Sequence, residues 1–444
     1  MDTRKAYPPV YKARKFLEPL TDTVNFLAYS PERYPEAFRF RVLGREVYVL
    51  NHPEYVQYVL QEKYRNYRKG EAYETLSILL GNGLINSEGE FWRRQRRLAQ
   101  PAFHAESLKR VSKYVVEVTG KHIDAWKKLE GKTINFTKEM AAVAIEVVAR
   151  ALFSSDISPA DINTVWHSVN YLNHTAIRMI RNPLAPPFWM PLPGYIKGRK
   201  FIATLDRIVY DIIRKRKSAR SGGPPDLLQL LLEVRDAETG ERMSEQQLRD
   251  EVMTIFLAGH ETTVNALSWT WYLLKQHADE EDALRKESRQ LGLELTFDHV
   301  PCLRKGSEVI FEAMRLYPPV YAIGRRPVAE GQIKGFAVFP HSRILINIIG
   351  LHHHPCFWEK PWTFNPVHFR DYDMKRDYRF LYIPFGAGPR TCIGNHFALM
   401  EMHLINALLS QRVEMELVSR QVEAVPQITL KPKGGIIMRI NKVY

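Results

Sequence analysis

The residue of this chain best suited to chemistry is Cys392, which lies in the glycine-rich stretch FGAGPRTCIG. A cysteine thiolate binds soft or borderline metal ions, and nearby glycines let backbone N–H groups point at its sulfur. Gly386 and Gly388 supply that freedom, and the ring of Phe385 would pack beside the metal group and tune its redox potential. Arg390 stands two residues before the cysteine, where its guanidinium can pair with a carboxylate of the same cofactor. A buried structural cysteine needs none of these neighbours, so the stretch predicts a thiolate-held metal cofactor.

A second group of polar residues lies inside an apolar helix predicted over residues 244–277. This helix would be roughly 50 Å long at 1.5 Å per residue, and its apolar character on nearly every side indicates that it crosses the middle of the protein. At its centre, the Thr262 hydroxyl can bond a carbonyl one turn back, and Glu261 offers a titratable proton source in apolar surroundings. The alternative is a kinked core helix with incidental polar residues. A zinc-protease motif beginning at His260 is excluded, because Val264 stands where the second histidine is required.

Both stretches resemble signatures of the cytochrome P450 family. The family's haem-binding loop, FxxGxRxCxG, matches throughout, and its distal-helix pattern, (A/G)Gx(D/E)T(T/S), matches the stretch AGHETT. The resemblance implies that Cys392 ligates the iron of haem b (Fe-protoporphyrin IX), where the thiolate favours O–O cleavage. It also implies that Ala258 lies beside the haem, and that Glu261 and Thr262 relay protons during dioxygen activation.

A third stretch, EAMR, places Glu312 and Arg315 on one face of a helix. Taken alone, this spacing is that of a common exposed ion pair. The resemblance implies instead a buried structural pair on the cysteine side of the haem, joined in the family by an arginine from a later FxPxRF segment. Here His368 stands at the arginine position, which leaves open whether the third member of the cluster is charged.

Further basic residues are candidates for the carboxylates of the cofactor. Trp92 and Arg96 follow the pattern WxxxR on a predicted helix, which brings an indole N–H and a guanidinium together. Alone, this pattern also fits a basic surface helix. Arg325 matches the family spacing RxxxxE, with Arg326 as the second possibility. The resemblance implies that these residues, together with Arg390, hold the haem propionates.

Composition limits the class of protein and its partners. The chain has 444 residues of ordinary globular composition, which excludes collagen, low-complexity disorder and small disulfide scaffolds. Its three cysteines cannot form a disulfide framework, and no apolar run approaches the roughly 20 residues of a transmembrane helix. We therefore expect a soluble, cytoplasmic protein. The net charge of +14 suits an acidic protein partner, and nucleic acid binding has no support besides this charge.

The expected fold is mainly α with a minor β portion, arranged as in a cytochrome P450 with a long central helix over a haem. We expect a single domain spanning residues 1–444, because the motifs form one site from Trp92 to Cys392. The β-rich parts are predicted at about 36–52, 320–350 and 412–444, and the helical parts at about 53–317 and 394–411.

The predicted function is that of a haem-thiolate monooxygenase that uses dioxygen and two electrons to hydroxylate a lipophilic molecule, fatty-acid-like or terpenoid-like. Few residues follow Cys392, so a separate ferredoxin or flavodoxin with its reductase is the expected electron donor. Arg93 and Arg97 lie one helical turn apart and are candidates for its docking patch. The alternatives are a haem-thiolate isomerase or peroxide-using enzyme, and a non-catalytic haem-binding sensor.

Overall fold

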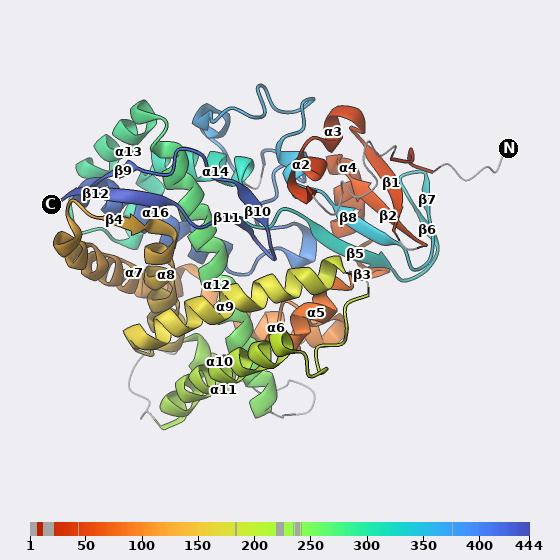
Figure 1. Cartoon of the computed structure of the whole chain (residues 1–444), viewed down its shortest axis with the longest axis horizontal. Coiled ribbons are helices and arrows are strands. Elements are labelled where there is room, and N and C mark those ends of the chain that lie inside the picture. The colour runs from red at the N-terminus through yellow and green to blue at the C-terminus, as the bar shows by residue number, and fades with distance from the viewer. Residues whose placement is uncertain are drawn as a thin grey trace.

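The computed structural model describes residues 7–11, 22–42, 44–182, 184–218, 226–233, 235, 240, 242–374 and 376–444. These residues form a mainly helical body with a small sheet-rich part at one end, as the sequence predicts (Figure 1). Glycines and prolines predict a break in the helical pattern at residues 218–225, of which residues 219–225 lie outside the described residues.

Most of the described chain is helical, and the longer helices form the body of the molecule (Figure 1). The helices are α2 (Thr23–Ala28), α3 (Ser30–Arg33), α4 (Pro53–Gln57), α5 (Ala72–Leu80), α6 (Gly89–Ala99), α7 (Ala105–Trp126), α8 (Phe136–Phe153), α9 (Pro159–Arg181), α10 (Pro193–Ser218), α11 (Leu227–Glu233), α12 (Glu245–Leu274), α13 (Ala278–Gln290), α14 (Arg304–Leu316), α15 (Ile348–His352) and α16 (Asn395–Arg412).

Helix α12 runs through the centre of the molecule, with α9 crossing it (Figure 1). It begins after Ser244, whose hydroxyl accepts a hydrogen bond from the backbone N–H of Gln247, while the Gln247 side chain accepts one from the Ser244 N–H. Most of its residues are buried, because apolar side chains cover nearly all of its circumference. The prediction of a long central helix is confirmed, although α12 ends at Leu274, three residues before the expected end.

The sheet-rich part is built around a five-stranded sheet with the order β1-β2-β8-β5-β3. Strands β1 and β2 form the hairpin that the alternation of residues 38–42, the turn at Gly44 and the returning strand at 47–50 predict, and β2 pairs in parallel with β8. A three-stranded sheet, β4-β12-β9, lies at the opposite end of the molecule (Figure 1). The strands are β1 (Ala37–Val42), β2 (Arg45–Leu50), β3 (Tyr67–Lys69), β4 (Thr133–Asn135), β5 (Ile323–Pro327), β6 (Gly331–Ile333), β7 (Phe336–Val338), β8 (Arg343–Ile346), β9 (Val413–Leu417), β10 (Ala424–Pro426), β11 (Leu430–Pro432) and β12 (Ile437–Val443).

Strands β3 and β4 lie in the part of the chain for which the sequence predicts only helices. Each has three residues, which is too short for an alternating pattern to be visible. Both pair with strands far away in the sequence: β3 pairs with β5, and β4 pairs with β12. Their existence therefore depends on tertiary contacts rather than on local pattern.

Candidate active site

The cysteine loop is held in one shape by backbone contacts. The backbone N–H of Cys392 donates a hydrogen bond of 2.8 Å to the carbonyl of Phe385, which closes the loop on itself. Gly386 and Gly388 both have φ of +69°, a conformation that side chains disfavour. A Cβ at Gly388 would also lie 2.0 Å from the carbonyl oxygen of Leu60. These two glycines are thus required by the local fold, as the sequence spacing suggests.

The residue Cys392 has solvent-accessible surface, although many protein atoms surround its thiol. Burial raises the pKa of this thiol, while a hydrogen bond from the Gly394 backbone and the charge of Arg96 act in the opposite direction. A metal ion bound to the sulfur would displace the proton, since a coordinating thiol is deprotonated outright. The loop therefore presents one accessible sulfur with a donor aimed at it.

One stretch of α12 is less buried than the rest of the helix. Ala258, Gly259, Glu261 and Thr262 are partly exposed, whereas the residues on both sides of this stretch are buried. The Thr262 hydroxyl donates a 2.9 Å hydrogen bond to the carbonyl of Ala258, one turn back. The two polar residues singled out in the sequence, Glu261 and Thr262, thus lie in the part of the helix centre that is not fully buried.

The carboxylate of Glu261 is held by three donors. The side chains of Asn173 and Thr429 each donate a 2.7 Å hydrogen bond to Oε1, and Nζ of Lys431 lies 2.8 Å from the same oxygen. Burial alone would raise the pKa of Glu261, but the Lys431 charge and these hydrogen bonds bring it below its ordinary value. Glu261 and Lys431 also line a cavity of about 360 Å³ beside α12. The acid is therefore ionised and paired.

Glu312 and Arg315 on α14 form a fully buried ion pair. The guanidinium contacts both carboxylate oxygens, at 2.8 and 2.7 Å, and also donates to the carbonyls of residues 352, 361 and 363. Nδ1 of His368 lies 3.3 Å from Glu312, so the histidine occupies the third place in the cluster. The arrangement is the buried one that the resemblance implies, not an exposed helical pair.

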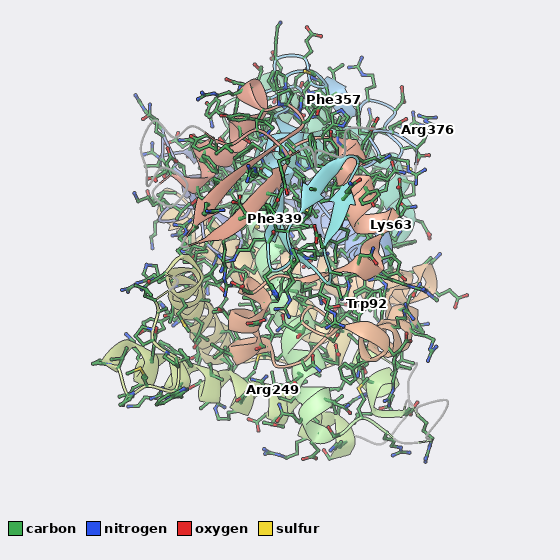
Figure 2. The ribbon with its side chains drawn as sticks, turned by 90° about the vertical axis from the view of Figure 1, so that its right-hand side faces the viewer. Lys63, Trp92, Arg249, Phe339, Phe357 and Arg376 are labelled. Carbon is green, nitrogen blue, oxygen red and sulfur yellow. The ribbon has the colours of Figure 1, made fainter. Side chains whose placement is uncertain are left out.

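Trp92, Arg96 and Arg390 lie together beside the cysteine loop. The Arg390 guanidinium is 4.2 Å from the centroid of the Trp92 ring, and the Arg96 guanidinium is 6.0 Å from it. Arg96 donates a 2.7 Å hydrogen bond to the carbonyl of Thr391, next to the cysteine. Figure 2 shows Trp92 between the five-stranded sheet and Arg249 at the start of α12.

The two arginines of β5 have different environments. Arg325 is buried and pairs across the sheet with Lys69 of β3. Arg326 is exposed and forms an ion pair with the exposed Glu74. Arg325 is thus the better placed of the two candidates for an internal carboxylate. Sequence reasoning missed Lys69, because a single lysine in a three-residue strand has no pattern that distinguishes it.

Comparison with known proteins identifies the family of this chain. The model of the cytochrome P450 family matches residues 17–442. The chain belongs to the cytochrome P450 family. It is therefore an oxidoreductase of the monooxygenase type, which needs dioxygen, a substrate and a redox partner.

Relatives of this P450 are known in several organisms. Cyclooctatin synthase of Streptomyces melanosporofaciens is 33% identical over 92% of this chain and 89% of its own, and cyclooctat-9-en-7-ol 5-monooxygenase of the same organism is 33% identical over 88% and 84%. The crystal structure of the cytochrome P450DA heme domain superposes with a TM-score of 0.88 at 25% identity, covering 98% of this chain and 97% of that one. Among the described residues, no helix of this P450 is long and apolar enough to cross a membrane.

The residues of this P450 fit a haem held by a thiolate. The accessible sulfur of Cys392 is the ligand type that the family uses. The indole N–H of Trp92 and the partly buried guanidinium groups of Arg96 and Arg390 beside it are donors suited to two carboxylates. The loop backbone at Gly388 packs so closely against Leu60 that no side chain fits there. This contact helps to fix the position of the loop that carries the sulfur.

Proposed function

We propose that this P450 hydroxylates a lipophilic small molecule, fatty-acid-like or terpenoid-like, with haem b on Cys392 and Glu261 with Thr262 as the proton-relay pair. Bound haem supplies the activation of dioxygen, and the chain supplies position and protons. The observation that carries the proposal is the less buried stretch of α12, where a hydroxyl and an ion-paired acid occur side by side in an otherwise buried helix. A haem sensor or carrier has no use for such a pair.

The proton path is argued from the contacts of Glu261. Its Oε1 is 2.8 Å from the Lys431 ammonium, and both groups line the cavity of about 360 Å³. A proton arriving from this cavity meets the Glu261–Lys431 pair before it meets Thr262. Release of the carboxylate from Lys431 would let Glu261 turn toward the accessible part of α12 and hand on the proton. The Thr262 hydroxyl, which donates to Ala258, can accept from a donor on its other side.

The substrate class is supported by two relatives. Their names describe the synthesis of cyclooctatin and the monooxygenation of cyclooctat-9-en-7-ol, an unsaturated alcohol. This chain is 33% identical to both, so a mainly hydrocarbon substrate of this general kind is the class to test first. Pockets that recognise such molecules are lined mostly by apolar side chains.

The electron donor is proposed to be a separate ferredoxin or flavodoxin with its reductase, docking on the outer face of α6. Arg97 is exposed there, one turn from Arg93, which forms an ion pair with Glu90. Trp92 and Arg96 of the same helix point to the cationic cluster beside Cys392. The helix thus has one face toward the cofactor site and one basic face toward solvent, which suits an acidic partner.

The function is tested by spectroscopy followed by turnover. The reduced CO complex should have the Soret position of thiolate-ligated haem, and terpenoid or fatty-acid ligands should shift the Soret band of the resting enzyme. With a surrogate ferredoxin and reductase, a binding ligand should be hydroxylated with consumption of dioxygen. A CO spectrum of the imidazole type would refute Cys392 as ligand, and turnover with peroxide alone would favour the peroxide-using alternative.

A further inference from the structure

A cavity of about 360 Å³ lies where α9 crosses α12, beside the β10–β11 hairpin (Figure 1). Its volume is within the range of roughly 300–1,000 Å³ that is typical of small-molecule sites. His260 and Val264 line it from α12, one turn apart. Residues two apart on a helix are about 200° apart around its axis, so this face is opposite to that of Ala258 and Thr262. The cavity therefore lies on another side of α12 than the proposed haem site.

Most of the cavity wall is apolar. The apolar side chains come from α9, from α12 and from the hairpin, and they are Trp166, Val169, Val264, Val425 and Pro432. Val425 of β10 and its cross-strand partner Lys431 of β11 face the same side of the hairpin, which brings one ammonium group into this wall. Such a wall favours a ligand with a hydrocarbon body, because contact with it removes apolar surface from water.

The charged groups around the cavity balance one another. Nζ of Lys431 is paired with Glu261 at 2.8 Å, and the exposed Lys433 is paired with Glu423. His260 is buried, which lowers its pKa, so its imidazole is neutral at pH 7. A charged ligand would place an uncompensated charge against apolar walls, and we therefore expect a neutral ligand.

Two atoms of the cavity residues can accept a hydrogen bond from a ligand. Gln427 lines the cavity, and its Oε1 is buried without a partner among the described residues. The terminal amide of a glutamine rotates over a broad range, so Oε1 can turn to a ligand in the cavity. Nδ1 of His260 lies 2.9 Å from the Phe256 carbonyl, which can only accept, so Nδ1 carries the proton and Nε2 is an acceptor. A ligand with a hydroxyl group supplies the donor that a buried acceptor lacks.

We propose that this cavity binds a neutral lipophilic alcohol, whose hydroxyl donates to Oε1 of Gln427 and whose hydrocarbon body packs against the apolar wall. The inference rests on the proposed function in one respect, because such an alcohol is the product that hydroxylation of a lipophilic molecule yields. A substrate without a hydroxyl lacks the donor, so hydroxylation creates the group that the cavity binds. The cavity is thus a second ligand site, for product rather than substrate.

The test uses the holoenzyme as its reduced CO complex, which is diamagnetic, with 5-fluorotryptophan in place of tryptophan. Trp166 lines the cavity, and its fluorine-19 NMR signal is identified as the one of eight that is missing from W166F. The probes are geraniol, its methyl ether, which keeps the oxygen but lacks the O–H donor, and geranic acid, which is ionised at pH 7.5. Binding at the haem is followed separately by the Soret shift of the resting enzyme.

We expect geraniol to shift the Trp166 signal until the site is saturated. The ether should bind about fivefold more weakly, as one hydrogen bond is lost, and geranic acid at least about tenfold more weakly. In Q427L geraniol should bind about as weakly as the ether, so that the difference between the two ligands disappears. Q421L, the same change at an exposed glutamine six residues away, should behave as the wild type.

Four results would overturn the inference. They are a Trp166 signal that does not move up to the solubility limit of geraniol, equal binding of alcohol and ether by the wild type, tighter binding of geranic acid, and a Trp166 shift that follows the Soret shift and is unchanged in Q427L. The last result would place geraniol at the haem alone. Should Q427L fail to fold, the comparison of alcohol with ether in the wild type still decides.

The outcomes also separate this inference from the proposed function. A CO spectrum of the imidazole type, together with a saturable Trp166 shift that depends on the hydroxyl and on Gln427, would refute the proposed haem ligand and support the alcohol site. A thiolate CO spectrum without that shift would support the haem ligand and refute the alcohol site.

Discussion

The ion pair between Lys431 and Glu261 allows a test of how the proposed proton-relay acid is held. The two side chains are only 13% and 12% exposed, and their charged atoms are 2.8 Å apart. At an effective dielectric constant of ~20, unit charges at this distance attract by about 6 kcal/mol, most of which offsets their desolvation. In K431M, Glu261 keeps its bonds from Asn173 and Thr429 but remains a buried charge without a counter-ion.

We expect K431M to lose about 3 kcal/mol of stability at pH 8, the lower end of the range for breaking a buried pair. For 444 residues, the unfolding entropy of ~2.1 cal/mol/K per residue gives about 0.9 kcal/mol/K, so Tm should fall by about 3 °C. The control is K433M, two residues away, whose exposed pair with Glu423 should be worth under about 0.5 kcal/mol.

The pH dependence of this loss has a definite sign. In the wild type the pKa of Glu261 is lowered, so its contribution to stability is present at neutral pH and is lost as pH falls through the folded-state pKa. In K431M burial dominates and raises that pKa, so the protonated acid is tolerated at low pH and the penalty grows as pH rises. The Tm difference between K431M and wild type should therefore be larger at pH 8 than at pH 5.

Differential scanning fluorimetry of the holoenzymes at both pH values measures these differences. The double variant E261Q/K431M should recover most of the lost Tm, because it removes the uncompensated charge. Equal Tm losses for K431M and K433M, or a larger K431M loss at pH 5 than at pH 8, would refute the reasoning.

Three further predictions concern the α12 pair, the α14 cluster and the cysteine loop. T262A should consume reductant while releasing more peroxide per product, measured as the ratio of peroxide to hydroxylated product; unchanged coupling would contradict the proton-relay role. H368A should lower Tm, because it removes a partner of the buried Glu312. H368R should have a higher Tm than H368A, because it places a positive partner there. Equal Tm values for the two variants would show that the position tolerates any side chain. G388A should lose haem even under mild conditions, because its Cβ would meet Leu60 O at 2.0 Å; a normal haem content and CO spectrum would show that the loop can move.

Much of the fold follows from local patterns in the sequence. The alternation in residues 38–42 and the turn at Gly44 predict the hairpin, because each side chain on a strand faces the opposite side from its neighbour. The apolar run around Ala258 predicts the central helix, and Ser244 marks its start as N-cap. Strands β3 and β4 could not be predicted in this way, since their pairing partners lie far along the chain.

The candidate cofactor-binding residues also fall into two groups, those that local spacing predicts and those that only the folded structure places. Cys392, Gly386 and Gly388 belong to one short loop, so their spacing alone brings them together. The burial of Glu312 and Arg315 could not be read from an i, i+3 spacing that exposed helices also have. The spacing to Glu330 already favours Arg325 over Arg326, but only the structure shows that Arg325 is buried and Arg326 exposed, because a strand reverses its face at every residue.

The sequence by itself determined the family and the central helix and predicts the thiolate ligand, because each is encoded in contiguous residues whose spacing matches a local geometry. Only the tertiary structure showed which charged side chains lie close to one another. Lys431 reaches Glu261 from β11, and Lys69 meets Arg390 from β3, over separations of 170 and 321 residues along the chain. Electrostatic interactions act through space and depend on burial, so the charge balance of the site appears only when the chain is folded.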